Sequence, residues 1–239
     1  MQTPRTKAMP LRKEGTAPKA PEGRRAKKHR ATRSSLLRAA YEVMSQDGID
    51  GARIKDITDR ADVGFGTFYN YFEDKDAIAR QVLDCLIHDL GERIRDATAH
   101  LRTIDTALLM GVSNRLALRA AMADPIWQWW ALRPDLLFDR ISKGFGLFAM
   151  ADVRLAIETG HSYLSESQVE SAWALAAWTM VGGIHDVFVG DREPESEAFV
   201  AQSIMRLMGA TNEDVQRTTA TDLPPCPPAA IDWDFVLPS

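Results

Sequence analysis

The chain of 239 residues has few cysteines and no long apolar run. Two cysteines, Cys85 and Cys226, cannot build a disulfide framework. The longest weakly polar stretch, residues 173–184, has 12 residues, whereas a membrane-spanning helix needs roughly 18 or more. No apolar run of the kind found in a signal peptide follows the first Arg and Lys residues. We therefore expect a cytoplasmic protein without a membrane segment.

Motifs of catalysis and metal binding are also lacking. His88 and His100 lie too far apart on one helix to share a metal ion. The sequence contains no Gly-rich phosphate loop, no HExxH motif and no GxSxG motif. We expect a protein that is not an enzyme and that uses no metal and no cofactor.

The charge is distributed unevenly along the chain. Residues 1–33 hold 11 Lys and Arg against 2 Asp and Glu, whereas the remaining 206 residues hold 18 against 31. A basic segment on an acidic body indicates a partner with phosphate groups at one end only, because a body of this charge repels DNA and anionic lipid.

The spacing of apolar residues predicts an all-α fold. Residues 1–30, rich in Pro, Lys and Arg, are predicted to form a flexible basic arm. Residues 31–78 hold three short helices, and Asp74 then caps a long helix that leads into a larger helical domain at residues 79–210. In that larger part the pattern predicts helices at residues 105–123, 125–132, 135–159, 166–189 and 195–209.

The last segment, residues 211–239, contains five prolines and is predicted to be neither helix nor core. Near its end, apolar residues alternate with Asp232 and Asp234. Two interpretations are open: a disordered tail, or a strand-like segment that docks one apolar face on the body.

The second and third short helices, with a tight turn between them, indicate a helix-turn-helix. At about 100° per residue, Phe68 and Phe72 share one face and point inward, so Asn70 points outward. Tyr69 and Tyr71 then lie near the two edges of the buried face. An outward face without bulk can approach base edges in the major groove, and the edge hydroxyls can reach phosphates.

Residues 51–78, GARIKDITDRADVGFGTFYNYFEDKDAI, resemble the DNA-binding signature of the TetR (tetracycline repressor) family of bacterial transcription regulators. The resemblance implies an N-terminal three-helix DNA-binding domain joined by a long helix to a ligand-binding and dimerisation domain. It implies base-facing positions at Phe65, Gly66, Thr67, Tyr69 and Asn70, with Gly64 before them. It also implies phosphate contacts from Arg53, Thr67, Tyr71 and Lys75.

The basic run at residues 24–30 has two interpretations. Lys27, Lys28 and Arg30 follow DNA phosphates or enter a minor groove, or the run is only a solvated charge cluster. The charge asymmetry of the chain favours the DNA contact.

The larger domain is rich in aromatic residues between positions 127 and 188, most of which are explained as core. Resemblance to the family implies an inducer pocket here, which an apolar or aromatic effector would fit. The candidate lining residues are Trp127, Trp130, Phe138, Phe145, Phe148, Trp178 and His185. Further polar candidates are Asn114, Arg133, His161 and Asp186.

The family pairs its last two body helices with their copies, which implies a homodimer. The candidate interface residues are Trp173, Met180, Ile184, Val200, Ile204 and Leu207. A dimer also suits the way DNA is read, because one short helix contacts few bases and two copies recognise a palindrome.

Together these features predict a repressor that a small apolar or aromatic effector releases from a palindromic operator in double-stranded DNA. Two alternatives are open. One is a DNA-binding regulator that is independent of ligands or controlled by a protein partner, and the other is a small-molecule binding protein without an operator.

Overall fold

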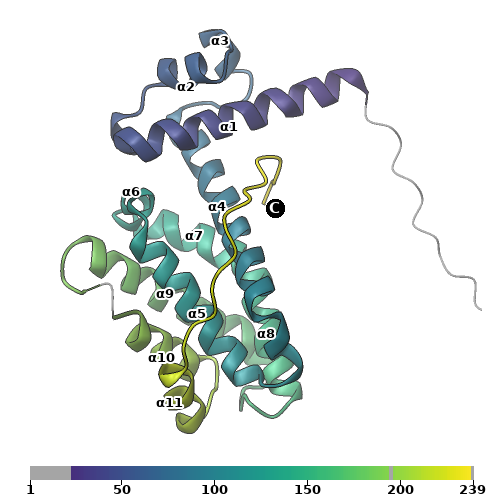
Figure 1. Cartoon of the computed structure of the whole chain (residues 1–239), viewed down its shortest axis with the longest axis vertical. Helices are drawn as coiled ribbons and strands as arrows, with labels where there is room; N and C mark the ends of the chain where they lie inside the picture. The colour runs from purple at the N-terminus through teal and green to yellow at the C-terminus, as the bar shows by residue number, and fades with distance from the viewer. Residues whose placement is uncertain (1–22, 194–195, 238–239) are drawn as a thin grey trace, which may run out of the picture.

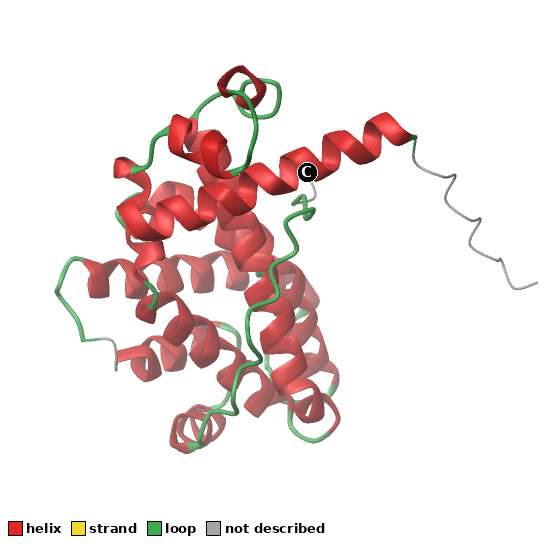
Figure 2. Cartoon of the chain, turned by 45° about the horizontal axis from the view of Figure 1, so that its top comes forward, coloured by secondary structure: helices red, strands yellow, loops and turns green. Residues whose placement is uncertain are grey.

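The computed structural model describes residues 23–193 and 196–237 of the chain. Within these ranges every regular element is a helix, as Figure 2 shows, so the predicted fold class is confirmed. None of the helices in the described part is both long and apolar enough to cross a membrane.

Three helices form a head at one end of the molecule (Figure 1): α1 (Arg24–Gly51), α2 (Ile54–Arg60) and α3 (Phe65–Phe68). Its core holds Leu37, Ile57 and Phe68, all with no exposed surface. Helix α1 begins at Arg24, so residues 24–30 of the predicted flexible arm are helical. Residues 1–22 of that arm lie outside the described residues.

Helix α4 (Lys75–Thr98) leads from the head into the body. The carboxylate of Asp74 accepts a hydrogen bond from the backbone N–H of Ala77 at 2.6 Å, which caps the helix as predicted. Ile78 and Val82 are fully buried near its start. The first turns of α4 pack on α1, and the helix also contacts α5 and α7 of the body.

The body is a bundle arranged around one central helix, α5 (Thr106–Ala123), which contacts α4, α8, α9, α10 and α11. The other body helices are α6 (Gln128–Ala131), α7 (Pro134–Gly144), α8 (Gly146–Glu158), α9 (Val169–Phe188), α10 (Glu197–Leu207) and α11 (Asn212–Ala220). Short 3-10 turns cover Ala99–Thr103, Pro125–Trp127 and Glu166–Gln168.

The single helix predicted at residues 135–159 is wrong, because the chain turns at Phe145 and forms α7 and α8. Glycines stand on both sides of this corner. A Cβ on Gly144 would lie 2.4 Å from Ile87 of α4, and a Cβ on Gly146 would lie 2.8 Å from the indole nitrogen of Trp173. Close backbone packing on two neighbours therefore fixes the corner, which a helical periodicity alone does not reveal.

The prediction that residues 211–239 hold neither helix nor core is also wrong. Residues 212–220 form α11, and Trp233 is only 8% exposed. Residues 221–237, which we call the C-terminal strap, run as a loop from α11 along α5 and α4 to a point beside α1 (Figure 1). Of the two interpretations of the chain end, docking on the body is confirmed for the described residues. The docked segment is a loop and forms no strand in the described part.

Gly144→Ala tests the packing at the corner. The added methyl group meets Ile87 in a filled core, so the free energy of unfolding should fall by about 1–3 kcal/mol. Urea unfolding followed by circular dichroism measures it. The control is Lys143→Ala at the exposed neighbouring position, where the change should stay within about 0.5 kcal/mol. Equal stability of the two variants would contradict the packing argument.

Candidate DNA-binding head and ligand cavity

The segment from Gly64 to Phe72 separates an inward face from an outward face. Phe68 and Phe72 are buried in the head, whereas Phe65 and Tyr69 are each 52% exposed. Gly66 and Asn70 are exposed beside them. Regular helix ends at Phe68 and the chain continues in turns to Tyr71, so the outward face is shorter than an extended helix to Phe72. Asp62, at φ 54°, forms the turn before it.

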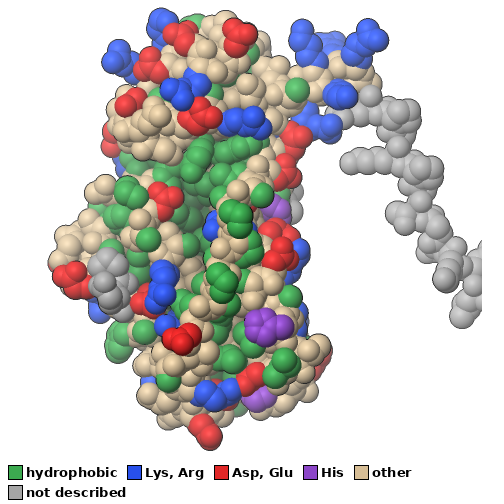
Figure 3. Space-filling model, in the orientation of Figure 1, with side chains coloured by type: hydrophobic (Ala, Val, Ile, Leu, Met, Phe, Trp, Pro, Cys, Tyr) green, Lys and Arg blue, Asp and Glu red, His purple; other side chains and the backbone are tan. Residues whose placement is uncertain are grey.

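The first turns of α1 lie next to this segment. A groove of about 380 Å³ is lined by Arg25, Lys28, Gly64, Thr67 and Tyr71, among others. The ring of His29 lies 4.5 Å from the ring of Tyr71. Figure 3 shows Lys and Arg side chains gathered around this end of α1. A basic groove with hydroxyl groups suits the backbone of a nucleic acid.

Not every basic candidate faces this groove. Lys27 is exposed on the same helix, whereas the Arg30 guanidinium pairs with the carboxylate of Asp234 at 3.3 Å. Arg30 is therefore engaged by the C-terminal strap.

Lys75 and Arg53 differ in what they contact. The Lys75 ammonium donates to the carbonyl oxygens of Asp50 at 2.9 Å and Ala52 at 3.1 Å. It thus ties the first turn of α4 to the end of α1, a structural task that its sequence position did not indicate. Arg53 is well exposed and pairs only loosely with Asp56, at 3.7 Å.

A cavity of about 50 Å³ lies in the body between α4, α5, α8 and α9. Its walls are mainly apolar and sulfur-containing, and one face of α5 contributes four residues at helical spacing. The lining residues are Gly91, Ile94, Arg95, Arg102, Met110, Ser113, Asn114, Ala117, Phe145, Phe148, Ala149, Asp152, Trp173, Met180 and Met208. This volume has room for roughly three to five water-sized groups.

Polar groups in the cavity wall are few and mostly engaged. The Asp152 carboxylate is buried and lies 2.6 Å from the Arg102 guanidinium. Burial raises the pKa of this carboxyl, and the charge of Arg102 opposes the shift. The side-chain amide of Asn114 donates to the carbonyl oxygen of Met110 at 2.8 Å. The cavity thus offers a compact apolar space with polar groups at its edge.

The placement revises the set of ligand-binding candidates. Phe145, Phe148 and the polar candidate Asn114 line the cavity. The other candidates lie elsewhere. Trp127 and Trp130 are buried near α6, and Phe138 and Trp178 stack on each other at 4.1 Å. His185 and Asp186 lie beside Arg192, Arg133 lies over Trp129, and His161 lies near α11. The aromatic count did not distinguish these groups, because core and cavity aromatics share one helical spacing.

The dimer candidates are also revised. Met180, Ile184, Val200 and Ile204 are at most 5% exposed within the chain itself, and Trp173 lines the cavity. They are therefore unavailable to a second copy in this arrangement, and only Leu207 is partly exposed. The exposed apolar residues of this region are Leu175, Trp178 and Val189 on and after α9, and Phe199 on α10.

The sequence of the head is similar to those of known transcription regulators. Residues 36–82 match the family model described as bacterial regulatory proteins, tetR family. The chain is 38% identical over 60 residues to the uncharacterised HTH-type transcriptional regulator YvdT of Bacillus subtilis. It is 39% identical over 62 residues to the HTH-type transcriptional repressor DhaR of Mycobacterium sp.. These alignments span 25% and 26% of this chain and 31% of each relative.

The likeness in fold extends further. A solved structure of RolR in complex with the ligand resorcinol matches with a TM-score of 0.76, covering 84% of this chain and all of that one at 23% identity. The two structures share an all-α head that one long helix joins to a helical body. The tetR family model thus matches the head of this chain, and the likeness to RolR concerns the fold.

Proposed function

We propose that the protein is a transcriptional repressor whose head reads an operator in double-stranded DNA. The observation that carries this proposal is the outward set Phe65, Gly66, Tyr69 and Asn70 beside the basic groove of Lys28. A Cβ added at Gly66 would have no atom of another residue within 4 Å, apart from its two neighbours in the chain and the backbone of its own helix. Because packing does not require this glycine, close approach to DNA explains it best. DhaR, a relative in this domain, carries the name of a repressor.

We infer a homodimer on a palindromic operator. The exposed apolar side chains of Leu175, Trp178 and Phe199 lie on α9 and α10, two helices that pack on each other. Gly183 packs on Val200 within the chain, whereas a Cβ on Gly182 would meet nothing within 4 Å. A second copy pressed on this face would cover these apolar groups and use the small surface at Gly182.

We propose as effector a compact phenol, a single ring with one or two hydroxyl groups, which would enlarge the cavity of about 50 Å³ by displacing a lining side chain. The aromatic rings of Phe145, Phe148 and Trp173 supply flat apolar contact. Asn114, Ser113 and the Arg102–Asp152 pair supply polar partners for hydroxyl groups at the rim. RolR, which shares this fold, binds resorcinol in its solved complex.

Effector binding would act by population shift. A ligand that prefers a body arrangement in which the two heads no longer match successive major grooves lowers DNA affinity. The coupling is reciprocal, so DNA must lower effector affinity by the same factor. Helix α4 is the connecting element, since it starts in the head and lines the cavity with Gly91 and Ile94.

Asn70→Ala tests the reading face. Loss of a base contact should weaken binding to DNA selected from a randomised pool by about 5- to 150-fold, the equivalent of roughly 1–3 kcal/mol. Fluorescence anisotropy at fixed salt measures the affinity. The control is Gln46→Ala, an exposed position near the C-terminal end of α1. Lys28→Ala should instead weaken all DNA alike and reduce the salt slope by about 1. Unchanged selectivity in Asn70→Ala would contradict the assigned reading face.

Ala117→Leu tests the cavity. The larger side chain fills space that a ring would occupy, so resorcinol binding measured by calorimetry should weaken by at least about tenfold. Ala123→Leu, at an exposed position on the same helix, is the control and should bind as the unaltered protein does. If the unaltered protein binds neither resorcinol nor phenol, the proposed class of effector is wrong.

Phe199→Asp tests the dimer face. A charge at this exposed apolar position should shift the protein from dimer to monomer at micromolar concentration. Sedimentation velocity distinguishes the two states. Ile104→Asp, at a position 75% exposed in the loop before α5, is the control and should leave the dimer intact. A monomeric unaltered protein would contradict the assembly.

A further inference from the structure

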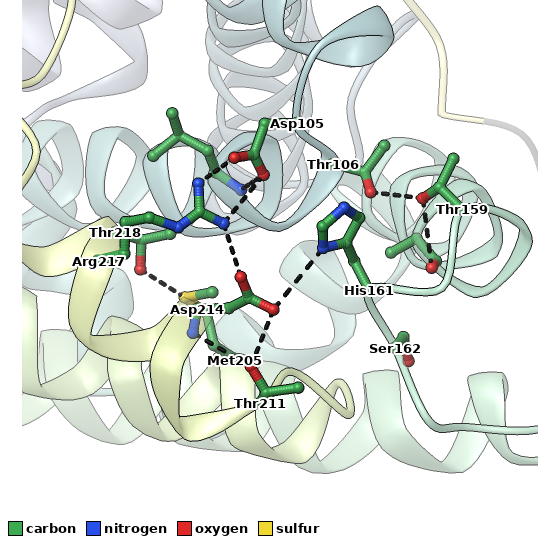
Figure 4. Close-up of polar contacts among 12 residues, drawn as sticks. Asp105, Thr106, Thr159, His161, Ser162, Met205, Thr211, Asp214, Arg217 and Thr218 are labelled. Atoms are coloured by element: carbon green, nitrogen blue, oxygen red, sulfur yellow. Dashed lines mark hydrogen bonds and ion pairs between the residues drawn. The ribbon is translucent and has the colours of Figure 1, made fainter.

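The C-terminal strap contacts both the body and the head, and its root is anchored firmly. Figure 4 shows the Arg217 guanidinium of α11 donating to the carboxylates of Asp105 and Asp214. His161 lies 3.7 Å from the other oxygen of Asp214. The hydrogen bonds from Arg217 hold the pKa of both carboxyls below the usual range, although burial alone would raise it. The strap therefore leaves the body from a fixed point.

Along its course the strap binds the side of α4. The Arg93 guanidinium donates to the carbonyl oxygen of Pro227 at 2.6 Å, and the N–H of Ala230 donates to the buried carboxylate of Asp89 at 2.8 Å. Because Asp89 is only 7% exposed, the strap backbone satisfies a group that burial would otherwise penalise.

At its tip the strap reaches the head. The ring of Trp233 packs 5.4 Å from that of Tyr41, and the Asp234 carboxylate pairs with Arg30 and accepts a hydrogen bond from the Ser34 hydroxyl. The strap carries three aspartates and no Lys, Arg or His in residues 221–237, so its charge complements the basic end of α1.

The strap also connects with the cavity through stacked rings. Phe148 lines the cavity, and its ring lies 6.5 Å from that of His88 on α4. The other neighbour of His88 is Phe235 of the strap, stacked at 3.8 Å with an angle of 4° between the rings. Gly91 allows this arrangement, because a Cβ there would lie 2.5 Å from the ring of Phe148.

We propose that the strap transmits the occupancy of the cavity to the DNA-binding head, through Phe148, His88 and Phe235 in that order. In the empty state the strap holds α1 against α4 and favours DNA binding. A ligand that displaces Phe148 disturbs the stack on His88 and loosens the tip from Arg30 and Ser34. This proposal rests on the assignment of the cavity as the effector site, and its mechanism is a contiguous set of packed groups that both sites bias.

Phe235→Ala in the full-length protein tests the strap, with Phe235→Leu as the milder variant. Val236→Ala is the matched control, since Val236 is the neighbouring residue and 61% exposed. Hydrogen exchange of residues 30–41, measured by mass spectrometry, should accelerate about 2- to 30-fold in Phe235→Ala, less in Phe235→Leu and not in the control. Affinity for the selected DNA should fall by a similar factor, and resorcinol should lower it less than in the unaltered protein.

Three results distinguish a failure of the strap proposal from a failure of the proposed function. Unchanged exchange of residues 30–41 in Phe235→Ala would overturn the strap proposal even if DNA binding is normal. Exchange that rises equally in α9 and α10 would overturn it too, because the strap would then only stabilise the whole fold. Absence of DNA binding by the unaltered protein would contradict the proposed function, and local acceleration at residues 30–41 would still support the contact of the strap with the head.

Discussion

The arrangement of this molecule depends on the burial of α4 in the head and the body at once. Ile78 and Val82 are sealed in the head, and Ile87 and Ile94 of the same helix are sealed in the body. A continuous helix transmits a shift at one end to the other because its backbone hydrogen bonds keep it rigid over 24 residues. Because Gly91 borders the cavity, a ligand-induced change there would reach the support of the head through α4, as the proposed function requires.

Close contacts at two glycines fix how α7 and α8 pack against α4. Gly91 lets Phe148 lie against α4, and Gly144 lets Ile87 press on the end of α7. These contacts leave little free space in the body, so the cavity is small and its shape depends on a few rings. In a core packed this closely, a ligand as large as a phenol would have to displace a side chain, as the strap proposal requires.

The head could be predicted in detail from the sequence because its signals are local. Phe68 and Phe72 are buried and Asn70 is exposed, as the helical spacing predicted. The role of Lys75 in binding the carbonyl oxygens of Asp50 and Ala52 could not be foreseen, since those residues precede it by more than 20 positions. The same is true of Arg30, whose partner Asp234 lies some 200 residues away.

The sequence by itself determined the all-α class, the helix-turn-helix and the basic end of the chain, because periodicity, capping and charge act within a few residues. Only the tertiary structure decided which aromatic residues line the cavity, which apolar residues stay exposed on α9 and α10, and where the strap docks. Trp173 and Trp178 illustrate the reason: they lie on one helix, yet the first lines the cavity and the second is 44% exposed. That difference is set by the helices that pack around α9, and these come from distant parts of the chain.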